Sequence, residues 1–132
     1  MLLLLDTDIC IYLIREQPTT VVARFNEYAV GDIGISTITL AELEYGVSKS
    51  SKPAKNKDAL DQFTTPLVIA DFDRAATVSY GKLRTALEKK GQMIGGMDLL
   101  IAAHAVSLNM PVVTHNVREF TRVPGLRVET WK

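Results

Sequence analysis

Short runs of apolar residues alternate along this chain with longer segments whose apolar positions recur at helical spacing. The run Leu2–Leu5 contains no polar residue, a pattern typical of a strand buried on both faces of a parallel sheet. The other predicted strands are Ile33–Ser36, Leu67–Ala70, Val112–Thr114 and Leu126–Val128. Because strands alternate with helices, we predict a three-layer α/β/α sandwich whose central, mainly parallel sheet has four or five strands.

Helices are predicted where apolar residues share one side and a capping residue precedes them. The predicted helical segments are Ile9–Arg15, Pro18–Tyr28, Leu40–Val47, a helix that ends at Phe63, Arg74–Lys90 and Met97–Leu108. Thr37 or Thr39 can cap the third of these, while Asp73 caps the long helix and Gly91 closes it. Residues 48–57 are polar and basic, and we interpret them as a loop.

The 132 residues are 47% hydrophobic and 23% charged, a composition typical of one globular domain, which we assign to residues 1–132. Fifteen basic and fifteen acidic side chains give a net charge of zero, which excludes a nucleic-acid binder with a globally basic surface. The charges are distributed unevenly. Residues 1–72 carry six basic and ten acidic side chains, and residues 73–132 carry nine basic and five acidic ones. We therefore expect an acidic site beside a basic surface.

The single cysteine, Cys10, excludes an intramolecular disulfide and is typical of a protein in a reducing compartment. Its apolar neighbours favour a buried packing role over a catalytic one. The apolar run at the N-terminus ends at Asp6, whereas a membrane span needs about 20 apolar residues, and no basic segment of a signal peptide precedes it. We predict a cytoplasmic protein that does not associate with membranes.

Acidic and hydroxyl residues occur where the predicted strands end, and ligands of open parallel sheets bind at such ends. Asp6 and Thr7 follow the first strand directly. Glu42 lies one turn into the helix after the second strand, and Asp98 opens the apolar helix before the fourth. The remaining polar residues at these strand ends are Ser36, Thr37, Thr114, His115, Asn116 and Glu119.

Each acid alone has a structural explanation. Asp6 can cap the next helix, and Glu42 can complete a capping box with Thr39. Asp98 in the first turn of its helix interacts favourably with the helix dipole. Several acids at one edge need a further explanation, because like carboxylates repel and raise one another's pKa. Carboxylate oxygens without a Cys/His cluster favour Mg²⁺ or Mn²⁺ over Zn²⁺. An acidic metal site beside a basic surface suits the hydrolysis of phosphodiesters.

Four segments carry these residues, and a fifth follows them. They are LDTD at residues 5–8, STITLAE at 36–42, GGMDLLIAAHA at 95–105, VVTHNVREF at 112–120 and RVPGL at 122–126. In order and spacing the chain resembles the PIN-domain ribonucleases, specifically the VapC-type toxins of bacterial toxin–antitoxin pairs. The resemblance covers essentially the whole chain.

This resemblance implies an endoribonuclease that depends on Mg²⁺ or Mn²⁺ and is inhibited by a cognate VapB-type antitoxin. It matches Asp6 and Asp98 to primary metal ligands, and Glu42 to a ligand through water or to the group that polarises the attacking water. Thr7 and Thr114 match hydroxyls that support the site. Relatives close to this pattern cleave the anticodon stem-loop of initiator tRNA, which makes that RNA a candidate substrate.

Many relatives have a fourth acid, an Asp, where this chain has Asn116, so the sequence departs from the family pattern at this position. We favour Glu119 as the fourth carboxylate and Asn116 as a neutral oxygen ligand or a neighbour that holds the ligands. Asp8 stands where relatives have Asp or Asn. We interpret Asp8 as a helix cap rather than a metal ligand.

Arg118 and Arg122 are the predicted RNA contacts, because they neighbour the acidic edge. Arg127 and the basic residues within 49–57 and 82–90 are further candidates, although charge runs usually form a solvated surface. Contacts to phosphates would make RNA binding depend on salt rather than on sequence.

Aromatic and histidine side chains have both structural and functional interpretations. Tyr12, Tyr45 and Trp131 could stack on bases, although core packing is the commoner fate of such residues. His104 is expected to pack in the core. His115 lies nearer the acidic edge, but an all-oxygen metal site does not need it.

Three segments, Ile9–Leu13, Val21–Phe25 and Leu40–Val47, offer more apolar surface than short strands need, so we expect a homodimer contact or an antitoxin helix there. One alternative function is a structure-specific DNA nuclease, for which the chain is short and lacks room for a helical arch. A catalytically silent interaction domain is another, and the presence of all three acids argues against it. A receiver domain would need a phosphoacceptor Asp and a later Lys at strand ends, which fit this chain poorly.

Overall fold

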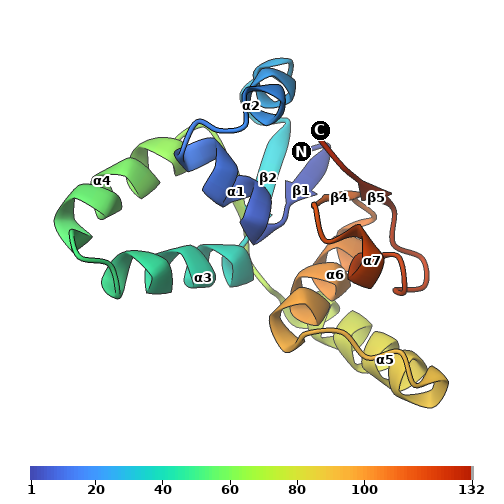
Figure 1. The fold of residues 1–132 in the computed structure, drawn as a ribbon. Helices are drawn as coiled ribbons and strands as arrows, with labels where there is room; N and C mark the ends of the chain where they lie inside the picture. The colour runs from blue at the N-terminus through green and yellow to red at the C-terminus, as the bar shows by residue number, and fades with distance from the viewer. Residues whose placement is uncertain (132) are drawn as a thin grey trace.

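Five parallel strands form the central sheet of the structure, a computed structural model that describes residues 1–131 (Figure 1). The strands are β1 (Leu3–Leu5), β2 (Ile33–Ser36), β3 (Val68–Ala70), β4 (Val112–Val113) and β5 (Val128–Glu129). Their order across the sheet is β3-β2-β1-β4-β5, and every neighbouring pair is parallel. β1 is the central strand, with its Leu4 aligned with Gly34 of β2 on one side and with Val112 of β4 on the other.

Helices cover both faces of this sheet. They are α1 (Thr7–Ile14), α2 (Thr19–Asn26), α3 (Thr37–Ser48), α4 (Pro53–Thr64), α5 (Arg74–Lys90), α6 (Gly96–Leu108) and α7 (Val117–Phe120). Leu3 and Leu5 pack against residues of α1 to α4, whereas Leu4 packs against residues of α5 and α6 on the opposite face, because successive strand side chains alternate. Figure 1 shows the two groups of helices on opposite sides of the strands. The predicted α/β/α sandwich is therefore confirmed.

Local capping explains where the helices around the sheet begin and end. Ser36, the last residue of β2, caps α3 by accepting a hydrogen bond from the Ile38 N–H at 3.0 Å, so the predicted cap at Thr37 or Thr39 is wrong. Asp73 caps α5, as predicted. Gly91 closes this helix with a φ of +64°, a backbone conformation that favours glycine.

Several boundaries differ from the sequence predictions, and one short helix was missed. α1 begins at Thr7, so Asp6 rather than Asp8 is its N-cap. α4 begins at Pro53, because proline suits the first turn of a helix, and the predicted loop over residues 48–57 shrinks to residues 49–52. The four-residue helix α7 was not predicted, since it is too short to show a helical period. β5 lies later than expected, because its pairing with β4 sets its position.

The parallel sheet brings the carboxyl ends of three strands to one edge. α1 and α3 begin there directly after β1 and β2, and α7 follows β4 after a short loop. Leu5 of β1 is aligned with Val113 of β4, so Asp6 and Thr114, the next residues of each strand, lie side by side. The topology therefore places the predicted acidic and hydroxyl residues of different segments in one region.

The N-terminal segment packs inside the protein. Cys10 is fully buried in α1, as predicted, and burial raises the pKa of its thiol well above the usual value. The thiol is therefore neutral and suited to packing rather than to nucleophilic chemistry. Among residues 1–131, no helix combines the length and the apolar character that crossing a membrane requires.

Leu4 and Leu2 provide a matched test of the central strand, because Leu4 is fully buried and Leu2 is 56% exposed. We expect Leu4→Ala to lower the free energy of unfolding by about 2–5 kcal/mol, since it leaves a cavity between β1 and α6. Leu2→Ala should change the free energy of unfolding by less than about 1 kcal/mol. Urea denaturation followed by circular dichroism measures both. Equal losses in the two variants would contradict the central position of β1.

Candidate active site

Asp6 lies at the point where the central strand becomes α1. Its side chain is only 3% exposed. One carboxylate oxygen accepts a hydrogen bond from the Thr7 N–H at 2.8 Å, and the other accepts one from the Thr114 hydroxyl at 2.7 Å. These two bonds hold the carboxylate in one orientation at the carboxyl edge of the sheet.

Glu42 reaches the same region from α3. Its Oε1 accepts a hydrogen bond of 2.6 Å from the hydroxyl of Thr7, the residue that follows Asp6. The alternative capping box with Thr39 does not form, because Ser36 is the N-cap and Glu42 lies in the second turn of the helix. The structure thus places Glu42 beside the start of α1.

Asp98, Asn116 and Glu119 form a third part of this region. The Asn116 side-chain amide donates one hydrogen bond to Asp98 at 3.3 Å and another to Glu119. Glu119 also accepts a bond of 3.3 Å from the Gly95 N–H. A Cβ at Gly95 would lie 3.3 Å from Asp98 Oδ2, so a side chain there would crowd the carboxylate.

Asp8 is not the N-cap of α1, so its interpretation as a helix cap is wrong. Its Oδ1 accepts a hydrogen bond from the Ile9 N–H at 2.7 Å, within the first turn of α1. Its Oδ2 accepts one from the His115 N–H at 3.0 Å and lies 3.4 Å from the Thr114 hydroxyl. Asp8 therefore fastens the loop after β4 to α1. Only the adjacency of β1 and β4, which depends on the strand order, could have indicated this contact.

The carboxyl groups of this region perturb one another. The pKa of Asp6 is raised to about 6, chiefly by burial and then by the charge of Asp8, with a smaller contribution from Glu42. The pKa of Asp98 is raised to about 7, first by burial, then by its hydrogen bond to Glu119 and by the neighbouring charges. That shared hydrogen bond and the amide of Asn116 lower the pKa of Glu119. A cation at this edge would relieve the mutual repulsion.

The oxygen-rich composition of this region is compatible with a hard divalent cation. In the part of the chain that the structure describes, no three Asp, Glu, His or Cys side chains are placed to hold a metal ion on their own. Mg²⁺ typically keeps several waters and takes one or two carboxylates plus phosphate oxygens of the substrate, so it does not require a complete protein cage. Asp6 and Asp98, whose pKa values are raised first by burial and then by neighbouring acids, fit this donor set.

The arginines and histidines considered in the sequence analysis lie outside the acidic cluster or form contacts elsewhere. Arg118 is exposed on α7, and the Arg122 guanidinium donates to the Met93 carbonyl at 3.0 Å. His104 is buried as predicted, with its Nδ1 2.7 Å from the Ser36 hydroxyl. The Nε2 of His115 lies 2.7 Å from the Trp131 carbonyl, so this ring is engaged outside the acidic cluster.

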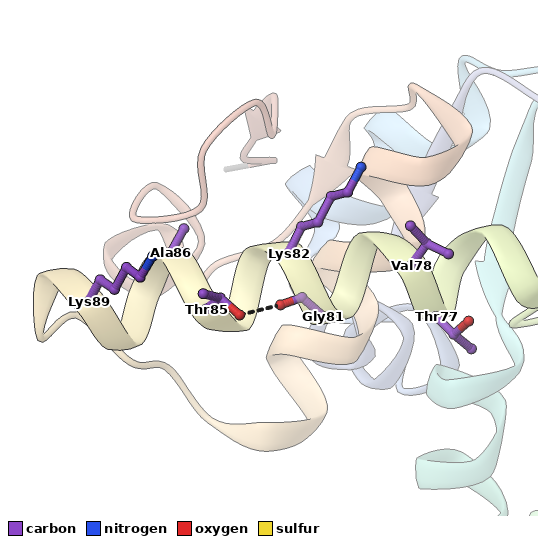
Figure 2. Close-up of a pocket in the computed structure, with 7 residues that line it drawn as sticks. All are labelled: Thr77, Val78, Gly81, Lys82, Thr85, Ala86 and Lys89. Carbon is purple, nitrogen blue, oxygen red and sulfur yellow. Dashed lines mark hydrogen bonds between the residues drawn. The ribbon is translucent and has the colours of Figure 1, made fainter.

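Figure 2 shows a hollow on α5 that shares no residue with the acidic cluster. It is lined by Thr77, Val78, Gly81, Lys82, Thr85, Ala86 and Lys89. All of these residues belong to one helix, and the Thr85 hydroxyl donates back to the Gly81 carbonyl at 2.8 Å. No acid lines this hollow, so it lacks the chemistry of the carboxyl edge.

Comparison with known proteins places this chain in a family. The model of the PIN domain matches residues 3–126. Ribonuclease VapC2 of Rickettsia felis is 48% identical over 132 residues, which cover 99% of this chain and 98% of the relative. The tRNA(fMet)-specific endonuclease VapC of Shigella flexneri is 42% identical over 128 residues, 97% of this chain and 96% of the relative.

A solved structure agrees with these relatives. The crystal structure of VapBC2 from Rickettsia felis bound to a DNA fragment from their promoter contains a chain with a TM-score of 0.94 and 47% identity, covering 100% of both chains. The class defined by the fold is thus the α/β/α sandwich of PIN domains. The chain belongs to the PIN-domain family and, within it, to the VapC group. The resemblance inferred from the sequence is confirmed.

The raised pKa values predict how stability depends on pH in the absence of divalent cations. A carboxyl whose pKa is higher in the folded state binds more protons there than in the unfolded chain, so stability falls as the pH rises from about 4 to about 7. Asp6→Asn should remove on the order of 2 kcal/mol of this loss, and Asp58→Asn, on the exposed surface of α4, should remove none. Urea denaturation in EDTA at several pH values measures the effect. A parallel pH profile for wild type and Asp6→Asn would contradict the assignment.

Proposed function

We propose that this chain is the endoribonuclease toxin of a VapBC-type toxin–antitoxin pair, acting in the cytoplasm as a single domain over residues 1–132. One observation carries the proposal: acids from distant segments meet at the carboxyl edge of the sheet, where Thr7, Thr114 and Asn116 hold them. The enzyme class inferred from the sequence agrees with the names of the relatives from Rickettsia felis and Shigella flexneri.

We infer that Asp6 and Asp98 would hold a divalent cation, Mg²⁺ or Mn²⁺. Their carboxylate oxygens are the hard donors that such ions take, and their raised pKa values support this choice. When bound, such an ion offsets charge on the phosphate oxygens and makes a water more acidic. The hydroxyl of Thr114 keeps the Asp6 carboxylate oriented, and the amide of Asn116 does the same for Asp98.

Glu42 is the proposed general base. Its Oε1 is held by the Thr7 hydroxyl, and within residues 1–131 no hydrogen bond engages its Oε2. That oxygen can therefore accept a proton from the water that attacks the phosphorus. We propose Glu119 as the fourth acid, because Asn116 links it to Asp98.

The proposed substrate is RNA, with initiator tRNA as the first candidate. The support is the relative of Shigella flexneri, which is named for specificity toward tRNA(fMet). Arg118, which is exposed on α7 next to Glu119, is the proposed phosphate contact at this edge, while Arg122 already donates to the Met93 carbonyl. Initiator tRNA would be cut in its anticodon stem-loop.

The proposed protein partners are a VapB-type antitoxin and a second copy of this chain. The solved structure from Rickettsia felis, a VapBC complex, supports the antitoxin. Much of the apolar surface predicted for a partner is used by the core, because Ile9, Leu13, Val21 and Leu43 are buried. Residues that remain partly exposed, such as Phe25, are the ones left for a partner.

The first functional test is cleavage of initiator tRNA and of total RNA with Mg²⁺ or with EDTA. We expect cleavage by the wild type only with the cation, and losses of about 100-fold or more in Asp6→Asn, Glu42→Gln and Asp98→Asn. Glu88→Gln, which removes an exposed acid of α5, should retain full activity. Gel electrophoresis of the products measures these rates.

The alternatives make different predictions in the same assay. A structure-specific DNA nuclease would cut flap DNA and leave RNA intact. A silent interaction domain would cut neither substrate. Full activity in EDTA, or in Asp6→Asn, would refute the proposed mechanism.

A second test distinguishes whether Glu119 or Asn116 fills the fourth position of the site. If Glu119 is the fourth acid, Glu119→Gln should lower activity by about tenfold or more at saturating RNA, because a carboxylate next to Asp98 is lost. Glu129→Gln, an exposed acid of β5, is the matched control. Unchanged activity in Glu119→Gln would leave Asn116 as the residue that fills this place.

A further inference from the structure

One face of α3 leads away from the acidic cluster. Glu42, Tyr45 and Lys49 are spaced three and four residues apart, so they lie along one side of the helix and its C-cap. Side chains on a helix lean toward its N-terminus, which directs Tyr45 toward the turn that carries Glu42. From Glu42 to Lys49 this stripe is about 10 Å long. It is continuous with the proposed active site.

Tyr45 is an aromatic side chain that the fold does not use. It is 65% exposed, whereas Trp131, another aromatic residue that could have stacked on a base, is buried. The Lys49 ammonium lies 4.7 Å from the centre of the Tyr45 ring, so the ring has a cation over one of its faces. An exposed ring next to a cation is the combination that binds unpaired nucleotides.

The lysines of residues 49–57 differ in their ion pairs. Lys57 is neutralised by Glu44 at 2.7 Å and by Asp61 at 3.0 Å. Lys49, Lys52 and Lys55 are exposed, and within residues 1–131 none of them forms a salt bridge. The positive charge of Lys49 beside Tyr45 is therefore available for phosphate groups.

We propose that Tyr45 and Lys49 form a nucleotide subsite for single-stranded RNA next to the catalytic acids. The ring of Tyr45 stacks a base that flanks the cleaved bond, and Lys49 contacts an adjacent phosphate. The inference rests on the proposed function, since it assigns the path of the RNA toward Glu42. It adds a contact region on α3 to Arg118 of α7.

Steady-state cleavage of an unpaired RNA oligonucleotide tests this subsite with Tyr45→Ala, Tyr45→Phe and Lys49→Gln. Tyr45→Ala should raise KM about tenfold, because base stacking on an aromatic ring is lost. Tyr45→Phe keeps the ring and should stay within about twofold of wild type. Lys49→Gln should raise KM and reduce the dependence of binding on salt by about one phosphate contact. Arg15→Gln, at the end of α1 remote from the acids, is the matched charge control.

Binding is measured separately from cleavage by placing each substitution on an Asp98→Asn background and following fluorescence anisotropy of labelled RNA. Weaker binding of Tyr45→Ala with retained binding of Tyr45→Phe supports the subsite, even if the wild type cleaves no RNA and the proposed function fails. Equal affinity of Tyr45→Ala and the parent overturns it. A change of molecular mass in ultracentrifugation with unchanged RNA affinity also overturns it, because Tyr45 would then serve a protein interface. Thermal unfolding confirms that each variant is folded.

Discussion

The rest of the structure depends on the electrostatic cost of holding several carboxylates together at a partly desolvated edge. Asp6 is almost fully buried, and its pKa and that of Asp98 are raised by burial and by neighbouring acids. Hydrogen bonds from Thr7, Thr114 and Asn116 hold the acids without neutralising them. The fold therefore maintains an arrangement that is unfavourable alone and that a bound cation would relieve.

The apolar core offsets the cost of this arrangement. Leu3, Leu4 and Leu5 are buried on both faces of the sheet, and the helices on each side contribute separate clusters. Because the central strand cannot shift without exposing these leucines, the position of Asp6 is determined by packing. The short strand β1 thus connects the packed core to the edge where the acids repel one another. The packing of the core offsets the free-energy cost of that repulsion.

The sequence predicted the layered fold and the main acids for physical reasons that act locally. Apolar runs identify buried strands, and an acid that follows such a run stands at a strand end wherever the strand lies. The family resemblance added roles for Asp6, Glu42 and Asp98 that spacing alone left open. The errors fell on features without a local period or with several equivalent caps: α7 is four residues long, and Ser36, Thr37 and Thr39 are all capping residues.

The sequence by itself therefore determined the α/β/α sandwich, the acids at the strand ends and the burial of Cys10 and His104. It could do so because hydrophobic periodicity and residue chemistry are local properties of the chain. Only the tertiary structure decided which acids are neighbours. The order β2-β1-β4 lets Asp8 bind the loop at His115, and it sets Thr114 against Asp6. The same holds for Tyr45. A tyrosine side chain can lie in the core or at the surface, and the packing of α3 left this ring in solvent. Contacts between distant segments depend on strand order and helix packing, which no local pattern encodes.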